Sequence, residues 1–269
     1  MHLEPFVVRS IEEEHLMGSC DGRVALVTGA GQGVGEGIAL ALAKEGAAVA
    51  AVGRTRSKVE ETCEQIAHAG GTAIAVEADV TDLESIPEVV EGVVDALGGL
   101  DILVNNAYTG RLGPLLSLDT YGFQRGFVAG PFAAFEFMRA AHPHLVARGG
   151  GHIINLVTSA MVRWDARNFG AYAASKQALR SLTRTAASEW GPDGIRVNNI
   201  APHALSPGLE WWIEENPEEA EEFIASIPLG YVGDCEQDIG RAVVMLVGPD
   251  AGYLTGATIP LDGGQAYFG

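Results

Sequence analysis

A tyrosine and a lysine that could move a proton together, Tyr172 and Lys176, stand in the run Tyr-Ala-Ala-Ser-Lys. On a helix, this i, i+4 spacing places the phenol and the ammonium on one face. The tyrosine phenol has a pKa of about 10, and a neighbouring ammonium favours the phenolate and lowers that pKa. The pair therefore indicates a general acid and base, although a core tyrosine beside a solvated lysine has the same pattern.

A glycine-rich turn, residues 28–35, directly follows the apolar run 24–27. Glycine lets the backbone adopt positive φ and approach a ligand closely. The helix expected to begin at about Val34 offers free N–H groups and a partial positive charge to an anion. The turn therefore predicts a site for the pyrophosphate of a dinucleotide. Its predicted binding residues are Gly29, Gly31, Gln32, Gly33, Val34 and Gly35.

Apolar strand-like runs alternate with helical patterns along the chain, which is typical of a parallel sheet covered on both faces. We expect an α/β fold, a doubly wound seven-stranded parallel sheet, with its ligands at the carboxyl ends of the strands. The predicted strands are 23–28, 47–53, 72–78, 100–105, 152–157, 195–200 and 257–261. The predicted helices begin at about Val34 and cover 57–69, 83–97, 119–148, 170–190 and 236–247.

Gly130 and Pro131 fall inside the helix predicted over 119–148. An interior proline removes a hydrogen bond and costs about 3 kcal/mol. We therefore expect a kink there.

The chain has 269 residues and a net charge of −18. The length fits one domain, and the charge argues against nucleic acid or an anionic membrane as a partner. No apolar stretch is long enough to span a bilayer. Three separated cysteines, Cys20, Cys63 and Cys235, support neither a metal site nor disulfides, which fits a cytoplasmic setting.

We expect residues 1–21 to form a flexible acidic arm and residues 22–269 to form the single dinucleotide-binding and catalytic domain. Within that domain, residues 205–228 are the predicted substrate lid. Trp211 and Trp212 in it are suited to cover an apolar or ring-containing substrate, while its many glutamates are expected to face water.

These motifs occur in the order found in short-chain dehydrogenases/reductases, and the chain resembles the single-domain branch of that family over residues 22–264. The resemblance is carried by T-G-x-x-x-G-x-G at 28–35, Asp79-Val80, N-N-A at 105–107, Y-x-x-x-K at 172–176, Asn198, Pro202, Thr255-Gly256 and Asp262-Gly263-Gly264.

The resemblance implies a role for each matching residue. Tyr172 would be the general acid and base, Lys176 would bind the nicotinamide ribose, and a hydroxyl near residue 158 would hold the substrate oxygen. Ser159 is chosen because it lies 13 residues before Tyr172, whereas counting from Asn155 favours Thr158. The remaining implied cofactor contacts are Asp79, Val80, Asn105, Ala107 and Pro202.

The end of the second predicted strand bears on the choice of cofactor. NAD enzymes of this fold generally place an acidic residue there, but this chain has Gly53 followed by Arg54 and Arg56. Guanidinium groups bind phosphates well. NADP(H) is therefore favoured, with NAD(H) as the alternative.

The chain also departs from the family's pattern. The asparagine that holds a water in the family's proton relay is replaced by Phe127, and the usual glycine after Pro202 is His203. His203 and Trp211 are predicted to contact the substrate together with Ser159 and Tyr172. His203 is alternatively a loop residue bonded to a carbonyl group.

The resulting hypothesis is an oxidoreductase that moves a hydride between NADP(H) and a ketone or secondary alcohol, without a metal. One alternative is an NADP-binding protein with little activity, because of Phe127. Another is a 3-oxoacyl thioester reductase, which the acidic chain disfavours unless Arg125, Arg139, Arg163 and Arg167 cluster. A homotetramer is expected, with a homodimer as the alternative.

Overall fold

The computed structural model describes residues 18–164 and 167–268, and these form a seven-stranded parallel sheet. The strands follow the order β3-β2-β1-β4-β5-β6-β7, so the sheet is doubly wound from β1. Their bounds are β1 Val24–Thr28, β2 Ala48–Gly53, β3 Thr72–Glu77, β4 Ile102–Asn105, β5 Gly151–Leu156, β6 Ile195–Pro202 and β7 Thr258–Leu261. The expected fold class and strand set are confirmed.

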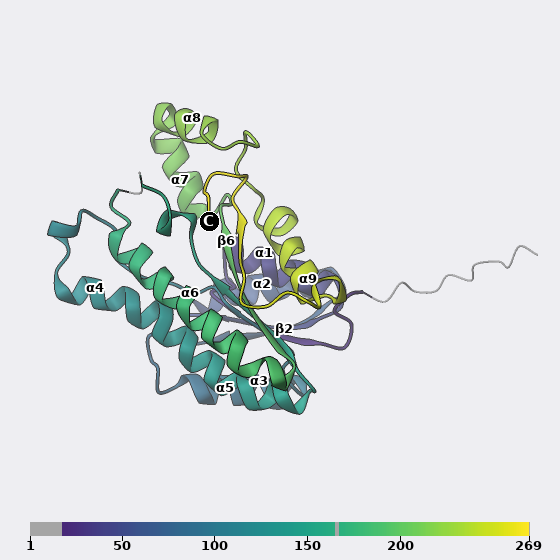
Figure 1. Cartoon of the computed structure of the whole chain (residues 1–269). Coiled ribbons are helices and arrows are strands. Elements are labelled where there is room, and N and C mark those ends of the chain that lie inside the picture. Colours follow the sequence, from purple (N-terminus) through teal and green to yellow (C-terminus); the bar gives the residue numbers. More distant parts are fainter. Residues whose placement is uncertain (1–17, 165–166, 269) are drawn as a thin grey trace, which may run out of the picture.

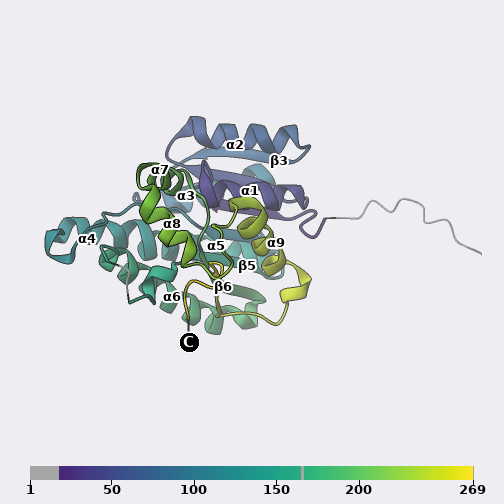
Figure 2. The ribbon, with the colours of Figure 1, turned by 90° about the horizontal axis from the view of Figure 1, so that it is seen from above.

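Helices cover both faces of the sheet (Figure 1). One face carries α1 (Gly33–Lys44), α2 (Arg56–His68) and α9 (Arg241–Val247). The other carries α3 (Ile86–Leu97), α5 (Ala133–Ala147) and α6 (Gly170–Trp190). The view from above shows α2 lying beside the edge strand β3 (Figure 2). Because both faces are covered, the central strands are nearly continuous apolar runs, and every residue of β1 and β4 is buried.

The segment predicted as one long helix is divided where proline was expected to disturb it. Helix α4 (Thr120–Phe127) passes through a π-helical turn, Val128–Phe132, into α5. Pro131 lies inside that turn. A proline cannot donate the helical hydrogen bond, and a π-turn accommodates the missing donor.

The predicted arm lies mostly outside the described residues. Its last part is packed against the domain, because the backbone N–H of Cys20 donates to the carbonyl of Glu45 at 2.9 Å. The Cys20 side chain is fully buried in the core beside α1. The folded unit therefore begins before residue 22.

The region predicted as a lid folds into two short helices, α7 (Pro207–Glu215) and α8 (Pro217–Ala225). They stand above the carboxyl end of β6 (Figure 1). The seven glutamates of this region are exposed, as expected: Glu210, Glu214, Glu215, Glu218, Glu219, Glu221 and Glu222.

Candidate active site

Helix α6 brings Tyr172 and Lys176 to the carboxyl edge of the sheet, as their spacing predicts. The Lys176 Nζ atom lies 5.7 Å from the centre of the Tyr172 ring. It donates a hydrogen bond of 2.7 Å to the carbonyl of Leu156, the last residue of β5. Lys176 is only 2 % exposed. The ammonium is therefore held at the sheet edge by a backbone acceptor.

Burial changes the ionisation of both groups. With a smaller contribution from Tyr108 and against the effect of Thr158, it raises the pKa of Tyr172 to about 12. It lowers the pKa of Lys176 to about 7. The sequence-based expectation that the lysine lowers the tyrosine pKa is not met in this structure, because burial dominates both groups.

Two adjacent hydroxyls at the end of β5 point to different partners. The side chain of Thr158 lies near Tyr172, where it lowers the pKa of the phenol against the larger effect of burial. Ser159 instead donates to the buried carboxylate of Asp262 at 2.5 Å. The structure thus brings Thr158, and not the expected Ser159, together with the tyrosine.

The glycine turn has the conformation that its composition indicates. Gly29 and Gly33 have φ values of +67° and +60°. A side chain at Gly35 would place its Cβ 2.2 Å from the carbonyl oxygen of Gly29. The amide of Asn106 supports the turn by donating to the carbonyls of Thr28 and Gly29 at 2.9 and 3.1 Å. Only glycine at these positions lets strand, turn and helix pack this closely.

The first turn of α1 keeps its N–H groups free of any side-chain cap, since its N-cap residue Gln32 accepts no such bond. The Gln32 side chain instead accepts a hydrogen bond from Lys58 on α2. Val34 packs against the core from the same turn. The free amides leave this helix end open to an anion.

A cavity of about 500 Å³ lies between the turn and the end of β2. Arg54 and Lys58 line it, together with Gly31 and Val80. Arg56 does not, because it pairs with Glu60 on the surface of α2 at 2.7 Å. Lys58 was not singled out from the sequence, since only the packing of α2 beside the turn brings it there.

Asp79 and Asn105 both have partners within the protein. Burial raises the pKa of Asp79, but hydrogen bonds from Thr81 and the charges of Arg54 and Arg125 outweigh it, so the pKa is lowered. The amide nitrogen of Asn105 donates to Asn155 at 2.8 Å. Its buried Oδ1 has no partner. Ala107 lines the cavity with Val80.

His203 follows Pro202, the last residue of β6, and packs against the lid. Its ring centre lies 4.9 Å from that of Phe223 on α8. Trp212 also meets Phe223 edge to face, at 5.7 Å between ring centres. Trp211 points outward and is 63 % exposed. The inward-facing tryptophan of the lid is therefore Trp212.

Burial lowers the pKa of His203, opposed by Asp262 and reinforced by Arg163. Its Nε2 atom is buried without a partner. The ring therefore stays uncharged at neutral pH and presents an unsatisfied nitrogen beneath the lid.

The phenyl ring at the family's asparagine position joins an aromatic cluster. Phe127 stacks on Phe123 at 5.2 Å and meets Phe132 edge-on at 6.4 Å between ring centres. All three rings are at least partly exposed. Phe127 thus supplies no polar group to the site.

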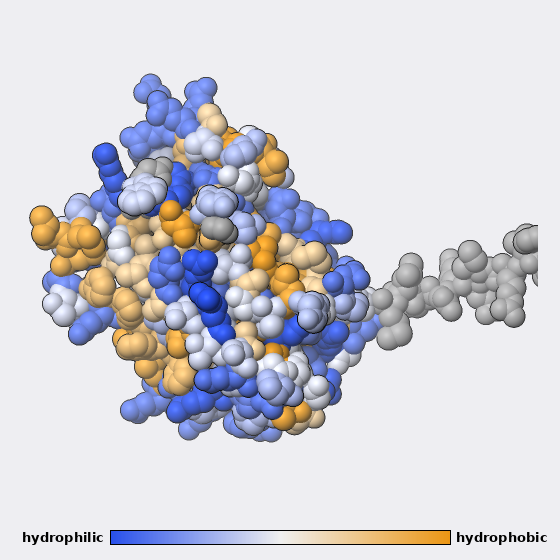
Figure 3. All heavy atoms as spheres, viewed as in Figure 1, coloured by the Kyte–Doolittle hydropathy of each residue, from blue (hydrophilic) through white to orange (hydrophobic). Residues whose placement is uncertain are grey.

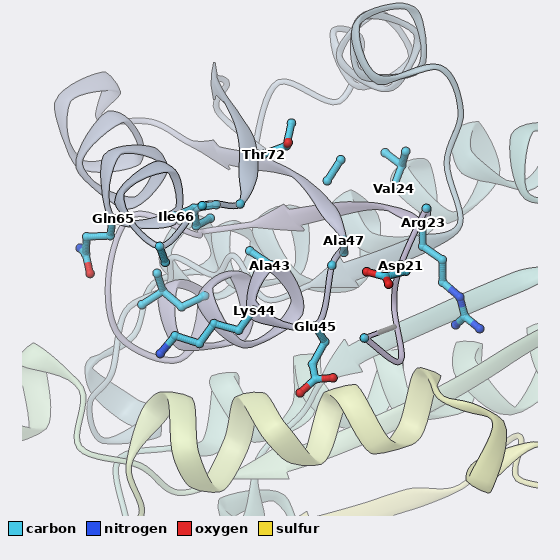
Figure 4. A pocket seen from close by; sticks show the side chains of 18 of the residues that line it. Asp21, Arg23, Val24, Ala43, Lys44, Glu45, Ala47, Gln65, Ile66 and Thr72 are labelled. Atoms are coloured by element: carbon cyan, nitrogen blue, oxygen red, sulfur yellow. The ribbon is translucent and has the colours of Figure 1, made fainter. Parts of the chain in front are cut away.

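A larger hollow lies away from this chemistry. It measures about 1370 Å³ and is lined by residues at the amino ends of β1, β2 and β3, among them Val24, Ala47 and Thr72 (Figure 4). Ligands of doubly wound sheets bind at the opposite edge. We therefore place the candidate site by its geometry and not by cavity size.

Within residues 18–164 and 167–268, no group of three or more His, Cys, Asp or Glu side chains is arranged to hold a metal ion. In the same part of the chain, every helix is too short or too polar to cross a bilayer.

The comparisons with known proteins agree with this geometry. Residues 29–266 match the sequence model of a dehydrogenase family described as enoyl-(acyl carrier protein) reductase. A 12alpha-hydroxysteroid dehydrogenase of Clostridium sp. is 37% identical, with 93% of this chain and 98% of that protein aligned.

Two solved structures extend the likeness to three dimensions. A 7alpha-hydroxysteroid dehydrogenase complexed with NADH and 7-oxo glycochenodeoxycholic acid is 31% identical, with a TM-score of 0.87 over 92% of this chain and 95% of the other. A Beutenbergia cavernae protein with bound NADP, provisionally described as an NAD(P)-dependent gluconate 5-dehydrogenase, is 36% identical, with a TM-score of 0.84 over 91% and 97%. The chain therefore belongs to the short-chain dehydrogenase/reductase family, the NAD(P)-dependent oxidoreductases of alcohol and carbonyl groups.

Proposed function

We propose that the chain interconverts a ketone and a secondary alcohol with NADP(H), using Tyr172 as its general acid and base. One observation carries this proposal: the Tyr172 phenol lies near Thr158 and beside the buried Lys176, at the same sheet edge as the glycine turn. A phenol with a raised pKa stays protonated at neutral pH, which suits the donor in carbonyl reduction.

The residues present fit a nicotinamide dinucleotide. The uncapped N-terminus of α1 and the positive-φ glycines would hold its pyrophosphate. The orphaned Oδ1 of Asn105 offers a buried acceptor beside Ala107. Val80, Asp79 and Pro202 border the same edge of the sheet. When bound, the cofactor supplies the hydride for ketone reduction or accepts it from the alcohol.

The protein residues would handle the proton and the substrate oxygen. Thr158 would hold the carbonyl oxygen next to the Tyr172 phenol, which gives its proton to that oxygen in reduction. In alcohol oxidation the phenolate would take the proton back, and Lys176 as an ammonium would stabilise that phenolate. Ser159, bonded to Asp262, would shape the loop and not touch the substrate.

The preference for NADP(H) rests on Arg54 and Lys58. Both line the cavity beside the end of β2, where Gly53 stands instead of an acidic residue. A 2′-phosphate there would meet two cations, while a plain ribose would find no carboxylate to bind it. Among the similar structures, one holds NADP and another NADH, so the family uses both.

The substrate is proposed to be apolar and ring-containing. Trp212 and Phe223 of the lid and His203 below it contact one another edge to face. The names of two similar proteins mention hydroxysteroids, and another is a hydroxynaphthalene reductase-like protein of Metarhizium robertsii, 35% identical. These substrates are fused-ring compounds, which supports the same class for this chain.

A panel of cyclic ketones, sugars and 3-oxoacyl thioesters, assayed with NADPH and NADH, tests the proposal. Wild-type protein should oxidise NADPH with fused-ring ketones. Tyr172→Phe should lower kcat by at least about 100-fold, because the proton donor is lost. Its Kd for NADPH, from fluorescence titration, should change less than about twofold. Full activity of this variant would refute the role of Tyr172.

A further inference from the structure

Tyr108 directly follows the Asn-Asn-Ala segment and lies against both reactive side chains. Its ring centre is 4.8 Å from that of Tyr172, in an edge-to-face arrangement. The Nζ atom of Lys176 lies 5.0 Å from the centre of the Tyr108 ring. An aromatic face at this distance stabilises an ammonium, and an edge-to-face pair restrains both rings. One side chain thus contacts the proton donor and the cation together.

The Tyr108 hydroxyl lies beside the first turns of α6. Burial raises the pKa of its phenol, and the neighbouring Ser175 side chain opposes that shift. The Ser175 hydroxyl donates to the backbone carbonyl of Tyr172 at 2.8 Å. Ser175 therefore connects the surroundings of the Tyr108 hydroxyl with the backbone of the residue that carries the reactive phenol.

Two glycines make room for this hydroxyl. A Cβ atom at Gly126, in α4, would lie 2.6 Å from the Tyr108 hydroxyl oxygen. A Cβ atom at Gly110 would lie 2.3 Å from it. Any larger residue at either position would displace the phenol. The hydroxyl therefore occupies a space that the sequence keeps open on two separate elements.

This space adjoins the place where the family's asparagine is missing. Gly126 immediately precedes Phe127, whose ring turns to Phe123 and Phe132. A Cβ atom added at Gly130, in the π-turn, would lie 3.5 Å from the Tyr108 ring and 3.6 Å from the Ser175 hydroxyl oxygen. On this side of Lys176, Tyr108 and Ser175 supply the polar groups that Phe127 does not.

The geometry points to Tyr108 as a positioning residue, which holds Tyr172 through Ser175 and holds Lys176 against its ring. This inference deepens the proposed function and rests on it for its kinetic part. Tyr108 itself transfers no proton to the substrate. Its loss should therefore change kcat and the ionisation of Lys176 more than substrate affinity.

A mutant cycle with Gly126 tests the role of the hydroxyl. Tyr108→Phe should lower kcat about tenfold with KM changed less than about twofold, because only the hydroxyl and its contact with Ser175 are lost. Gly126→Ala should have a similar effect, although alanine favours the helix. In the Tyr108→Phe background, Gly126→Ala should lower kcat no further, since the nearest ring atom would lie 3.6 Å from the alanine Cβ. Tyr121→Phe, at an exposed tyrosine of α4, is the matched control.

A measurement on the free protein tests the contact with Lys176. The chain has only three lysines, Lys44, Lys58 and Lys176, so carbon-13 lysine labelling gives three NMR signals. Lys44→Arg and Lys58→Arg assign them. Removal of the ring by Tyr108→Leu should lower the pKa of Lys176 below its value in Tyr108→Phe, because the ammonium loses its aromatic face.

The outcomes separate this inference from the proposed function. Additive losses in the Tyr108–Gly126 cycle, or an unchanged kcat in Tyr108→Phe, overturn the positioning role. Equal Lys176 titrations in the Phe and Leu variants overturn the contact with the ring. A wild-type protein that turns over no ketone refutes the proposed function, and the NMR titration then decides the inference alone.

Discussion

At the scale of single residues, Thr158 and Ser159 show how backbone geometry assigns chemistry. Thr158 is extended, with φ −149° and ψ 144°, so successive side chains point to opposite sides. One hydroxyl therefore turns to Tyr172 and the next to the buried Asp262. Thr158 and Ser159 are neighbours in the chain, but their hydroxyls have different surroundings.

This arrangement predicts different effects for two similar variants. Thr158→Ala should lower kcat about 100-fold, because the group that holds the substrate oxygen is lost while folding is spared. Ser159→Ala should lower kcat less than about fivefold but reduce Tm, since the buried Asp262 carboxylate loses its side-chain donor and keeps only the backbone N–H groups of Gly264 and Ala266. Steady-state kinetics and thermal unfolding of both variants check this. The reverse order of kcat losses would restore Ser159 as the substrate-binding hydroxyl.

The two arginines after β2 offer a second matched comparison. Arg54→Ala should weaken NADPH binding by about 10-fold or more and NADH binding less than about threefold, because only NADPH carries the 2′-phosphate. Arg56→Ala is the control, since Arg56 pairs with Glu60 outside the cavity. Fluorescence titration with both cofactors measures the four affinities. Equal losses with NADPH and NADH would exclude a 2′-phosphate contact at Arg54.

Some site residues could be predicted from the sequence because local spacing places them. Tyr172 and Lys176 share a helix face, and the glycine turn must follow a buried strand. Lys58 at the cavity, the contact of Tyr108 with Lys176, and the choice of Trp212 over Trp211 as the inward-facing ring could not be assigned in this way. Their roles depend on how α2, the loop after β4 and the lid pack in three dimensions, which no local pattern specifies.

At the scale of elements, the strands were the most predictable part. Residues buried on both faces give continuous apolar runs, and the observed bounds of β1 and β2 differ from the predicted ones by a single residue. The π-turn at Val128–Phe132 was foreseen only as a kink. Proline shows that a bond is lost, whereas the surrounding packing decides how the helix adjusts.

Strand β5 carries a half-buried histidine that should make stability depend on pH. Burial, with smaller contributions from Arg196 and Arg23 and against Asp101, lowers the pKa of His152 from 6.5 to about 3. Because the unfolded chain binds the proton more readily, stability is full above pH 6.5 and falls as the pH drops from there towards 3. The loss from this group between pH 7.5 and 5 is about 2 kcal/mol.

Urea unfolding of wild type and His152→Val at both pH values measures this contribution. The variant should lose about 2 kcal/mol less than wild type on acidification, because valine does not titrate. His203, whose pKa burial also lowers, remains in both proteins and cancels in the comparison. An identical pH dependence of the two proteins would contradict the burial of a neutral His152.

At the scale of the whole molecule, a strongly acidic chain also exposes large apolar side chains. Figure 3 shows apolar residues gathered over the region of α4, α5 and α6, and hydrophilic residues over the lid. The exposed set here includes Tyr121, Phe123, Phe132, Phe135 and Val146. Monomeric proteins seldom leave such contiguous apolar areas open, so self-association through this face is expected.

The predicted homotetramer can be tested on this face. Phe135 on α5 is 42 % exposed. Phe135→Glu should shift the oligomer to smaller species in light scattering after size exclusion, because a carboxylate would have to be buried at the interface. Ala67→Glu, on the exposed side of α2, adds the same charge elsewhere and should leave the mass unchanged.

The dependence of self-association on ionic strength provides a second test. Each chain carries a net charge of −18, so association brings like charges together and should weaken at low salt. Dilution series at low and high salt should therefore show tighter assembly of wild type at high salt, with little gain for Phe135→Glu. A wild-type mass equal to one chain under both conditions would rule out the proposed interface. Identical masses for Phe135→Glu and Ala67→Glu would show that the interface does not include this part of α5.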